Sequence, residues 1–157
     1  MADDILIVSF NCDSPEYKTE VALRDHFLRK PLGLKINEYD LADDSGSQHL
    51  GAFKDGKMIG CLILTLYTKE IIRVRQVVID EMFQSRGIGK RLMAEAENYA
   101  RANGYQIVKV MARKTAVLFY QKLGYGICSE EFNDTRSGLP HYRMEKILNK
   151  QKEVAHV

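Results

Sequence analysis

Long apolar runs, net charge and cysteine are all scarce in this sequence. No window approaches the roughly 18 consecutive apolar residues that a membrane-spanning helix needs, and Asp3 and Asp4 stand where a secretory signal would carry basic residues. We therefore expect a cytoplasmic protein with no membrane partner. The formal charge of +2 also gives no electrostatic reason to expect nucleic acid as a partner.

The three cysteines, Cys12, Cys61 and Cys128, are widely spaced and form no Cys-x-x-Cys pair. This pattern indicates neither a disulfide framework nor a zinc site, so we expect no metal and three reduced, structural thiols. A nucleophilic role for one of them would need a histidine close by in the fold, which the sequence does not locate.

The length of 157 residues suits one compact domain, which we expect at residues 1–148 with a polar tail at 149–157. The hydrophobic patterns predict helices at 15–29, 88–103 and 115–123, and strands at 5–10, 48–54, 57–67, 70–80, 105–112, 125–132 and 141–147. Ser14 and Pro15 read as the N-cap and first residue of the first helix, and Asp55-Gly56 reads as a hairpin turn. This order predicts an α/β fold with a mixed, mainly antiparallel sheet and a central parallel strand-helix-strand unit.

The most informative stretch, QSRGIGKR at residues 84–91, joins the end of an apolar strand to the start of an amphipathic helix. Gly87 and Gly89 allow a sharp turn and a close ligand approach, and the first amides of the helix are unpaired and favour phosphate. Arg86, Lys90 and Arg91 add positive charge. The alternative is an ordinary tight turn with a solvated basic face. Neither the dinucleotide fingerprint nor a Walker loop matches this spacing.

Two blocks of the sequence resemble the GNAT superfamily of N-acetyltransferases. Val77-Val78-Ile79, four residues and then Gln84-x-x-Gly87-x-Gly89 look like its acetyl-coenzyme A signature, and residues 116–125, AVLFYQKLGY, are similar to its late helix. The resemblance covers residues 48–147. It is nearest to a small, largely uncharacterised bacterial subgroup and implies the acyl-CoA N-acyltransferase fold, in which acetyl-coenzyme A splits the parallel pair.

The resemblance also implies which residues contact acetyl-coenzyme A. The pantetheine arm would pair with the strand backbone, and an amide near Ile79 would stabilise the oxyanion. The expected cofactor-binding residues are Val77, Val78, Ile79, Gln84, Ser85, Arg86, Gly87, Ile88, Gly89, Lys90 and Arg113. Arg113 departs from the family pattern, which has an asparagine there; the alternatives for it are a cofactor phosphate, an acidic substrate or solvent.

Tyr120 and His141 are the expected catalytic residues. The resemblance places Tyr120 near the acetyl sulfur as a general acid, and a phenol stays protonated at neutral pH. His141, after a Gly-x-Pro turn in residues 138–140, would be the general base, with a structural hydrogen bond as the alternative. Asp80 and Glu81 are further candidates for the general base, which would act through a water molecule. Arg73 and Arg75 stand where histone-type relatives carry a glutamate, which speaks against that mechanism.

The acceptor would be a small-molecule or peptide amine, selected by residues 22–44. There Arg24, Arg29 and Lys30 suggest either recognition of an acidic group or a solvated helix face. We expect an acetyl-coenzyme A dependent N-acetyltransferase that works by direct attack in a ternary complex. The alternatives are a non-catalytic acyl-coenzyme A binding or sensing module and an interaction domain without a ligand. An edge strand late in the chain offers a route to a homodimer.

Overall fold

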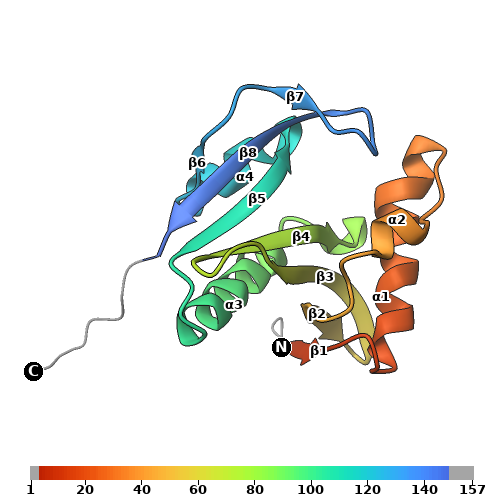
Figure 1. Ribbon diagram of the computed structural model, residues 1–157. Helices are drawn as coiled ribbons and strands as arrows, with labels where there is room; N and C mark the ends of the chain where they lie inside the picture. The colour runs from red at the N-terminus through yellow and green to blue at the C-terminus, as the bar shows by residue number, and fades with distance from the viewer. Residues whose placement is uncertain (1–3, 149–157) are drawn as a thin grey trace, which may run out of the picture. The chain divides into compact units, whose positions relative to one another are not determined.

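The computed structural model describes residues 4–148 (Figure 1). These residues form two compact units. The first unit contains residues 4–65 and 75–94, and the second contains residues 66–74 and 95–148. Strand β4 (Ile71–Ile79) and helix α3 (Ile88–Ala102) run through both units. The expected tail lies outside the described residues, and the expectation of a single domain stays a prediction.

The first unit is built on the antiparallel strands β1 (Ile5–Phe10), β2 (Gln48–Lys54) and β3 (Lys57–Leu66), which β4 follows in strand order. The expected hairpin between β2 and β3 is confirmed, because Asp55 and Gly56 have φ angles of 51° and 78°, as a two-residue turn of this kind requires. The core of this unit gathers around a cluster of four buried residues, Phe10, Met58, Cys61 and Val78.

Helix α1 (Glu16–Arg24) packs apolar side chains against this core and continues into a π-helical turn at Asp25–Arg29 and a 3-10 turn at Lys30–Leu32. The predicted Ser14 cap was wrong. The Ser14 hydroxyl instead interacts with Asn11 in the preceding turn, and the start of the helix has no side-chain cap. A short helix that the sequence did not predict, α2 (Glu38–Leu41), follows with a capping box between Asn37 and Asp40.

The second unit contains the parallel pair of the fold. The first half of β4 pairs in parallel with β5 (Ile107–Arg113), in a register that runs from Ile71 opposite Ile107 to Val74 opposite Val110. Strand β8 (Pro140–Ile147) pairs antiparallel with the other side of β5. The predicted mixed, mainly antiparallel sheet with a central parallel pair is therefore confirmed.

The predicted strand at 125–132 is broken into β6 (Gly126–Ile127) and β7 (Phe132–Asn133), both of which pair with β8. The reason lies between them: the Ser129 hydroxyl accepts the Arg143 backbone amide at 2.9 Å. A side chain thus takes a hydrogen bond that a strand carbonyl would otherwise accept, and the ladder is interrupted. Helix α4 (Val117–Lys122), preceded by a 3-10 turn at Lys114–Ala116, connects β5 to this region.

Candidate functional site

The glycine turn, residues 80–87, lies in the first unit and joins the end of β4 to the start of α3. An Asp80 carboxylate oxygen accepts the Met82 amide at 2.9 Å and so caps the 3-10 helix Glu81–Phe83. Ser85 and Gly87 then have φ angles of 65° and 77°, and α3 starts at Ile88. A Cβ on Gly87 would meet no atom within 4 Å, so its backbone conformation, rather than lack of space, favours glycine.

Positive charge at this turn comes from Arg86 and Lys90, which are both exposed. The Arg86 guanidinium lies over the Phe83 ring, 5.2 Å from its centroid. Arg91 was expected to add positive charge at the turn. Its Nη2 instead donates to the Ile5 carbonyl at 3.0 Å and connects α3 to β1. Two exposed cations therefore accompany the unpaired amides at the start of the helix.

The remaining residues of the turn fit an anionic ligand through their backbone. Gln84 Nε2 donates to the Ile79 carbonyl at 3.1 Å and closes the turn on the end of β4. Ile88 is buried in the core, so only its main chain is available to a ligand, and Gly89 is the second residue of α3. A left-handed turn, a helix N-terminus and exposed cations together fit a phosphate-bearing molecule such as an acyl-coenzyme A.

The strand before the turn is held closely against β3. The Asp80 amide donates to the Ile59 carbonyl at 2.8 Å, and a Cβ on Gly60 would lie 3.0 Å from both the Val78 carbonyl oxygen and Ile79 Cδ1. Gly60 is therefore required by the close approach of β4. The Val78 side chain is buried and those of Val77 and Ile79 are half-buried, so any contact with a ligand falls mainly to their main chain.

Tyr120 lies on α4 in the second unit and is 7 % exposed. Its ring packs edge-on against Phe119 and Tyr125, with centroid distances of 5.0 and 5.8 Å. Burial raises the pKa of Tyr120 to about 12. The phenol therefore keeps its proton throughout the neutral range, as a general acid must.

His141, on β8, lies opposite Arg113 of β5 in the antiparallel register. The imidazole is buried, and its Nδ1 is 2.9 Å from the Leu139 carbonyl oxygen. A carbonyl only accepts, so Nδ1 carries the hydrogen and Nε2 of the neutral ring keeps its lone pair. The hydrogen bond to Leu139 was the structural alternative to a role as general base. It instead fixes the tautomer that a general base needs. Arg113 is half-buried and has interactions of its own.

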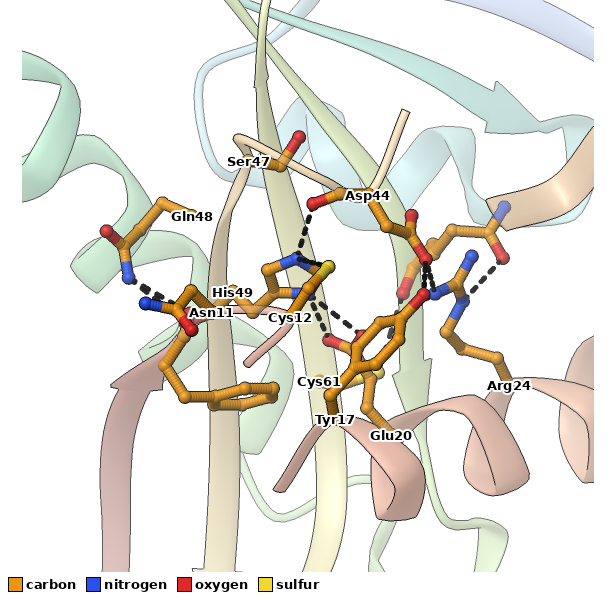
Figure 2. Close-up of polar contacts among 12 residues, drawn as sticks. Asn11, Cys12, Tyr17, Glu20, Arg24, Asp44, Ser47, Gln48, His49 and Cys61 are labelled. Atoms are coloured by element: carbon orange, nitrogen blue, oxygen red, sulfur yellow. Dashed lines mark hydrogen bonds and ion pairs between the residues drawn. The ribbon is translucent and has the colours of Figure 1, made fainter. Parts of the chain in front are cut away.

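A buried charge network in the first unit was not foreseen from the sequence (Figure 2). Asp44 is at its centre: its carboxylate accepts from Arg24 Nη1 at 2.7 Å and from the Tyr17 hydroxyl at 2.6 Å. His49 Nδ1 lies 2.9 Å from Glu20 Oε1, and its Nε2 lies 3.0 Å from the Asp44 carbonyl oxygen. All but Tyr17 are almost completely buried.

Both hypotheses for Arg24 and Arg29, acceptor recognition and a solvated face, were wrong. Arg24 is fully buried, and Arg29, which is 7 % exposed, donates to Asp40 at 3.0 Å. One signal for this was present in the sequence, since Glu20 and Arg24 fall on the same helix stripe as the core residues Tyr17 and Phe27. Lys30 is exposed.

The structure does place a histidine beside a cysteine, since His49 Nε2 is 3.8 Å from Cys12 Sγ. The same nitrogen faces the Asp44 carbonyl and so must carry a hydrogen, which leaves no lone pair to accept the thiol proton. Burial and the charge of Asp44 raise the pKa of the Cys12 thiol. This pair therefore lacks the features of an activated nucleophile. Within residues 4–148 there is also no cluster of three or more potential metal ligands.

The acetyltransferase (GNAT) domain family matches residues 18–148 of this sequence. The chain belongs to the GNAT family and is an acyltransferase. Uncharacterized protein YyaT of Bacillus subtilis is 25 % identical over 116 residues, which are 74 % of this chain and 76 % of that one. An uncharacterized N-acetyltransferase of Chlorobaculum tepidum is 29 % identical over 77 residues, 49 % of this chain and 48 % of its own length.

Solved structures support the fold of this GNAT domain. A putative N-acetyltransferase from Lactobacillus plantarum superposes with a TM-score of 0.82 at 22 % identity, covering 94 % of this chain and 100 % of that one. An aminoglycoside 6'-N-acetyltransferase complexed with coenzyme A has a TM-score of 0.77 at 15 % identity, covering 94 % and 99 %. In the described part of the chain, no helix is long and apolar enough to cross a membrane.

Proposed function

We propose that this GNAT domain transfers an acetyl group from acetyl-coenzyme A to a primary amine of a small molecule or peptide, by direct attack in a ternary complex. The observation that carries the proposal is the left-handed turn at Ser85 and Gly87, which ends β4, opens α3 and has Arg86 and Lys90 exposed beside it. That arrangement is suited to a pyrophosphate. The GNAT family of the chain and the coenzyme A in the aminoglycoside acetyltransferase support this choice of donor.

Acetyl-coenzyme A would supply the reactive thioester, and the residues of the first unit would hold it. The amides at the start of α3 would bind the phosphates together with Arg86 and Lys90, and the main chain of Val77, Val78 and Ile79 would pair with the amide-rich arm. Gln84, Ser85, Gly87, Ile88 and Gly89 shape the turn. Arg113 is retained in the proposed set as a further phosphate contact.

Two side chains, those of Tyr120 and His141, would move protons in the reaction. His141 Nε2, free of hydrogen in the neutral tautomer, would accept the proton of the attacking ammonium. Tyr120 would donate its hydroxyl proton to the departing thiolate, and its raised pKa of about 12 keeps that proton in place at neutral pH. Asp80 and Glu81 are not needed as bases in this scheme, and Asp80 already caps a helical turn.

A non-catalytic acyl-coenzyme A sensor is the second candidate, because it would use the same turn without Tyr120 or His141. Turnover separates the two functions. The sensor binds acetyl-coenzyme A and releases no coenzyme A with any amine, whereas the transferase releases it in proportion to the acetylated product. An interaction domain without a ligand would not bind the donor at all.

Calorimetric titration with acetyl-coenzyme A tests the donor site. We expect binding by the parent and a loss of at least tenfold in affinity in Gly89→Glu, which adds a side chain and a negative charge to the first turn of α3. Asn98→Glu is the matched control, since Asn98 is exposed further along the same helix. A folded parent that binds no acetyl-coenzyme A would overturn the proposal. Binding would lead to a screen of polyamines, amino acids and peptide N-termini for coenzyme A release.

A further inference from the structure

Gln76, within β4, has a backbone conformation that strands rarely contain. Its φ angle is 54°, in the left-handed region where the Cβ of any residue but glycine meets the backbone unfavourably. Such strained residues persist only where the surrounding structure holds them. Because Gln76 immediately precedes Val77, this local turn sets the direction of the main chain that follows it.

Two buried groups hold Gln76 from the core side of the strand. Arg24 Nε, on α1, donates to the Gln76 side-chain oxygen at 3.3 Å. The Cys61 thiol, on β3, lies 3.7 Å from the Gln76 carbonyl oxygen as its donor. Arg24 and Cys61 are both 0 % exposed, and burial raises the pKa of Cys61 well above its usual value, which keeps the thiol proton available. The side chain and the carbonyl of Gln76 are therefore both fixed.

Arg24 is itself held in one orientation. Its Nη1 donates to the Asp44 carboxylate at 2.7 Å (Figure 2). Its Nη2 donates to the Asp40 carbonyl at 3.0 Å and its Nε to the Gln76 side-chain oxygen at 3.3 Å. Asp44 is in turn fixed by Tyr17 and by Arg75 Nη1, the latter at 3.3 Å. A planar guanidinium with all three of its nitrogens engaged cannot rotate without leaving buried donors unpaired.

We propose that Arg24 and Gln76 are positioning residues for the acyl donor. The Asp44-Arg24-Gln76 chain fixes the left-handed turn in β4 and so aims the main-chain groups of Val77, Val78 and Ile79 at the acetylated arm. This proposal rests on the proposed function. It adds a functional reason for the buried ion pair between Arg24 and Asp44, which would not contact the substrate itself. It assigns the network to the acyl end of the donor and not to its phosphates, which the turn at Ser85 and Gly87 binds.

The variants that test this are made at Gln76, because changes at Arg24 would leave a buried charge unpaired and endanger folding. Gln76→Gly removes the acceptor for Arg24 while glycine adopts the positive φ without strain. Gln76→Glu keeps an oxygen that accepts from the guanidinium. Both variants retain the ion pair between Arg24 and Asp44.

Two ligands are titrated calorimetrically into each variant: acetyl-coenzyme A, and adenosine 3′-phosphate 5′-diphosphate, which has the phosphates without the arm. We expect Gln76→Gly to bind acetyl-coenzyme A at least tenfold more weakly and the nucleotide within twofold of the parent. Gln76→Glu should restore acetyl-coenzyme A affinity to within threefold. A merely structural role would instead weaken the binding of both ligands together in Gln76→Gly.

The outcomes separate this proposal from the one on which it rests. Equal acetyl-coenzyme A affinity in the parent and Gln76→Gly, or an equal loss for both ligands, overturns the positioning role and leaves the donor site standing. A parent that binds neither ligand overturns the proposed function and the positioning role with it.

Discussion

His49 Nδ1 lies 2.9 Å from each of the two carboxylate oxygens of Glu20, in a part of the first unit where both side chains are fully buried. The other ring nitrogen is directed at the Asp44 carbonyl oxygen. An imidazole with an acceptor at each nitrogen is best satisfied when both carry hydrogen. This pair connects α1 to β2.

Stability should depend on pH through His49. Burial alone would lower the pKa of His49, but the hydrogen bond and charge of Glu20 and the Asp44 carbonyl outweigh it, so the pKa lies above the usual 6.5. The stabilisation is therefore complete below about pH 6.5, the value in the unfolded chain, and is lost as the pH rises through the folded-state pKa. Urea unfolding from pH 5.5 to 9 should show this decline, and His49→Gln should flatten it.

His26→Gln is the control for that experiment, because His26 is exposed and its ring packs edge-on against Phe27. It should leave the pH dependence unchanged. Removing the ring in His49→Ala should cost about 3 kcal/mol of unfolding free energy, since buried Glu20 would lose its contact with His49 at 2.9 Å and keep the longer one with Arg24 at 3.5 Å. A pH dependence that persists in His49→Gln would assign it to another group.

Glu97 should be important for the stability of the second unit. It accepts from the Tyr125 hydroxyl at 2.8 Å and from Lys146 Nζ at 2.9 Å, and it is only 7 % exposed. We expect Glu97→Gln to lower the unfolding free energy by about 1–3 kcal/mol, because two hydrogen bonds lose their charged acceptor. Glu95→Gln, on an exposed position of the same helix, should change it by less than about 0.5 kcal/mol. Denaturant unfolding of both variants provides the comparison.

Tyr120→Phe separates the proposed general acid from a packing role. Losing proton donation should lower kcat by about a hundred- to ten-thousandfold, while the ring and its contacts with Phe119 and Tyr125 remain. The measurement is coenzyme A release with any accepted amine, with Tyr99→Phe on α3 as the control. Because the pKa of Tyr120 is about 12, its ionisation should cause no loss of rate between pH 8 and 10. Full activity in Tyr120→Phe would remove it from the mechanism.

Gly60→Ala tests the close approach of β4 to β3. The added methyl would lie 3.0 Å from the Val78 carbonyl oxygen and from Ile79 Cδ1, so we expect a loss of about 1–3 kcal/mol of unfolding free energy. Gly126→Ala is the matched control, because a Cβ there meets nothing within 4 Å. Equal stability of the two variants would show that β3 and β4 can separate without cost.

Predictions from the sequence were most accurate where local rules decide the outcome. The Asp55-Gly56 hairpin and the helix after the glycine turn were both predicted, because turn residues and helical periodicity act over a few neighbouring positions. The strand at 125–132 was predicted as continuous and is not, because the Ser129 hydroxyl takes the place of a strand carbonyl. Nothing in the alternation of side chains signals that substitution.

The residues of the candidate site also differ in whether local sequence or distant partners decide their role. The glycine turn and Tyr120 were proposed as site residues from short motifs, whose spacing is local in the sequence. Arg24 was misread, since a basic residue on a helix is usually solvated. The partners supplied by Asp40, Asp44 and Gln76, far from it in the sequence, allow it to be fully buried.

The family, most of the long helices and strands, and a turn suited to phosphate could be predicted from the sequence, because these depend on residue types at short and fixed spacings. Tertiary structure alone decided which charges are buried, that Gln76 has a left-handed backbone, and that the His49 nitrogen beside Cys12 carries a hydrogen. The burial of Arg24 and the fixed backbone of Gln76 depend on groups that are distant in the chain and meet only on folding, as Arg24 meets Asp44 and Gln76, which are 20 and 52 positions away.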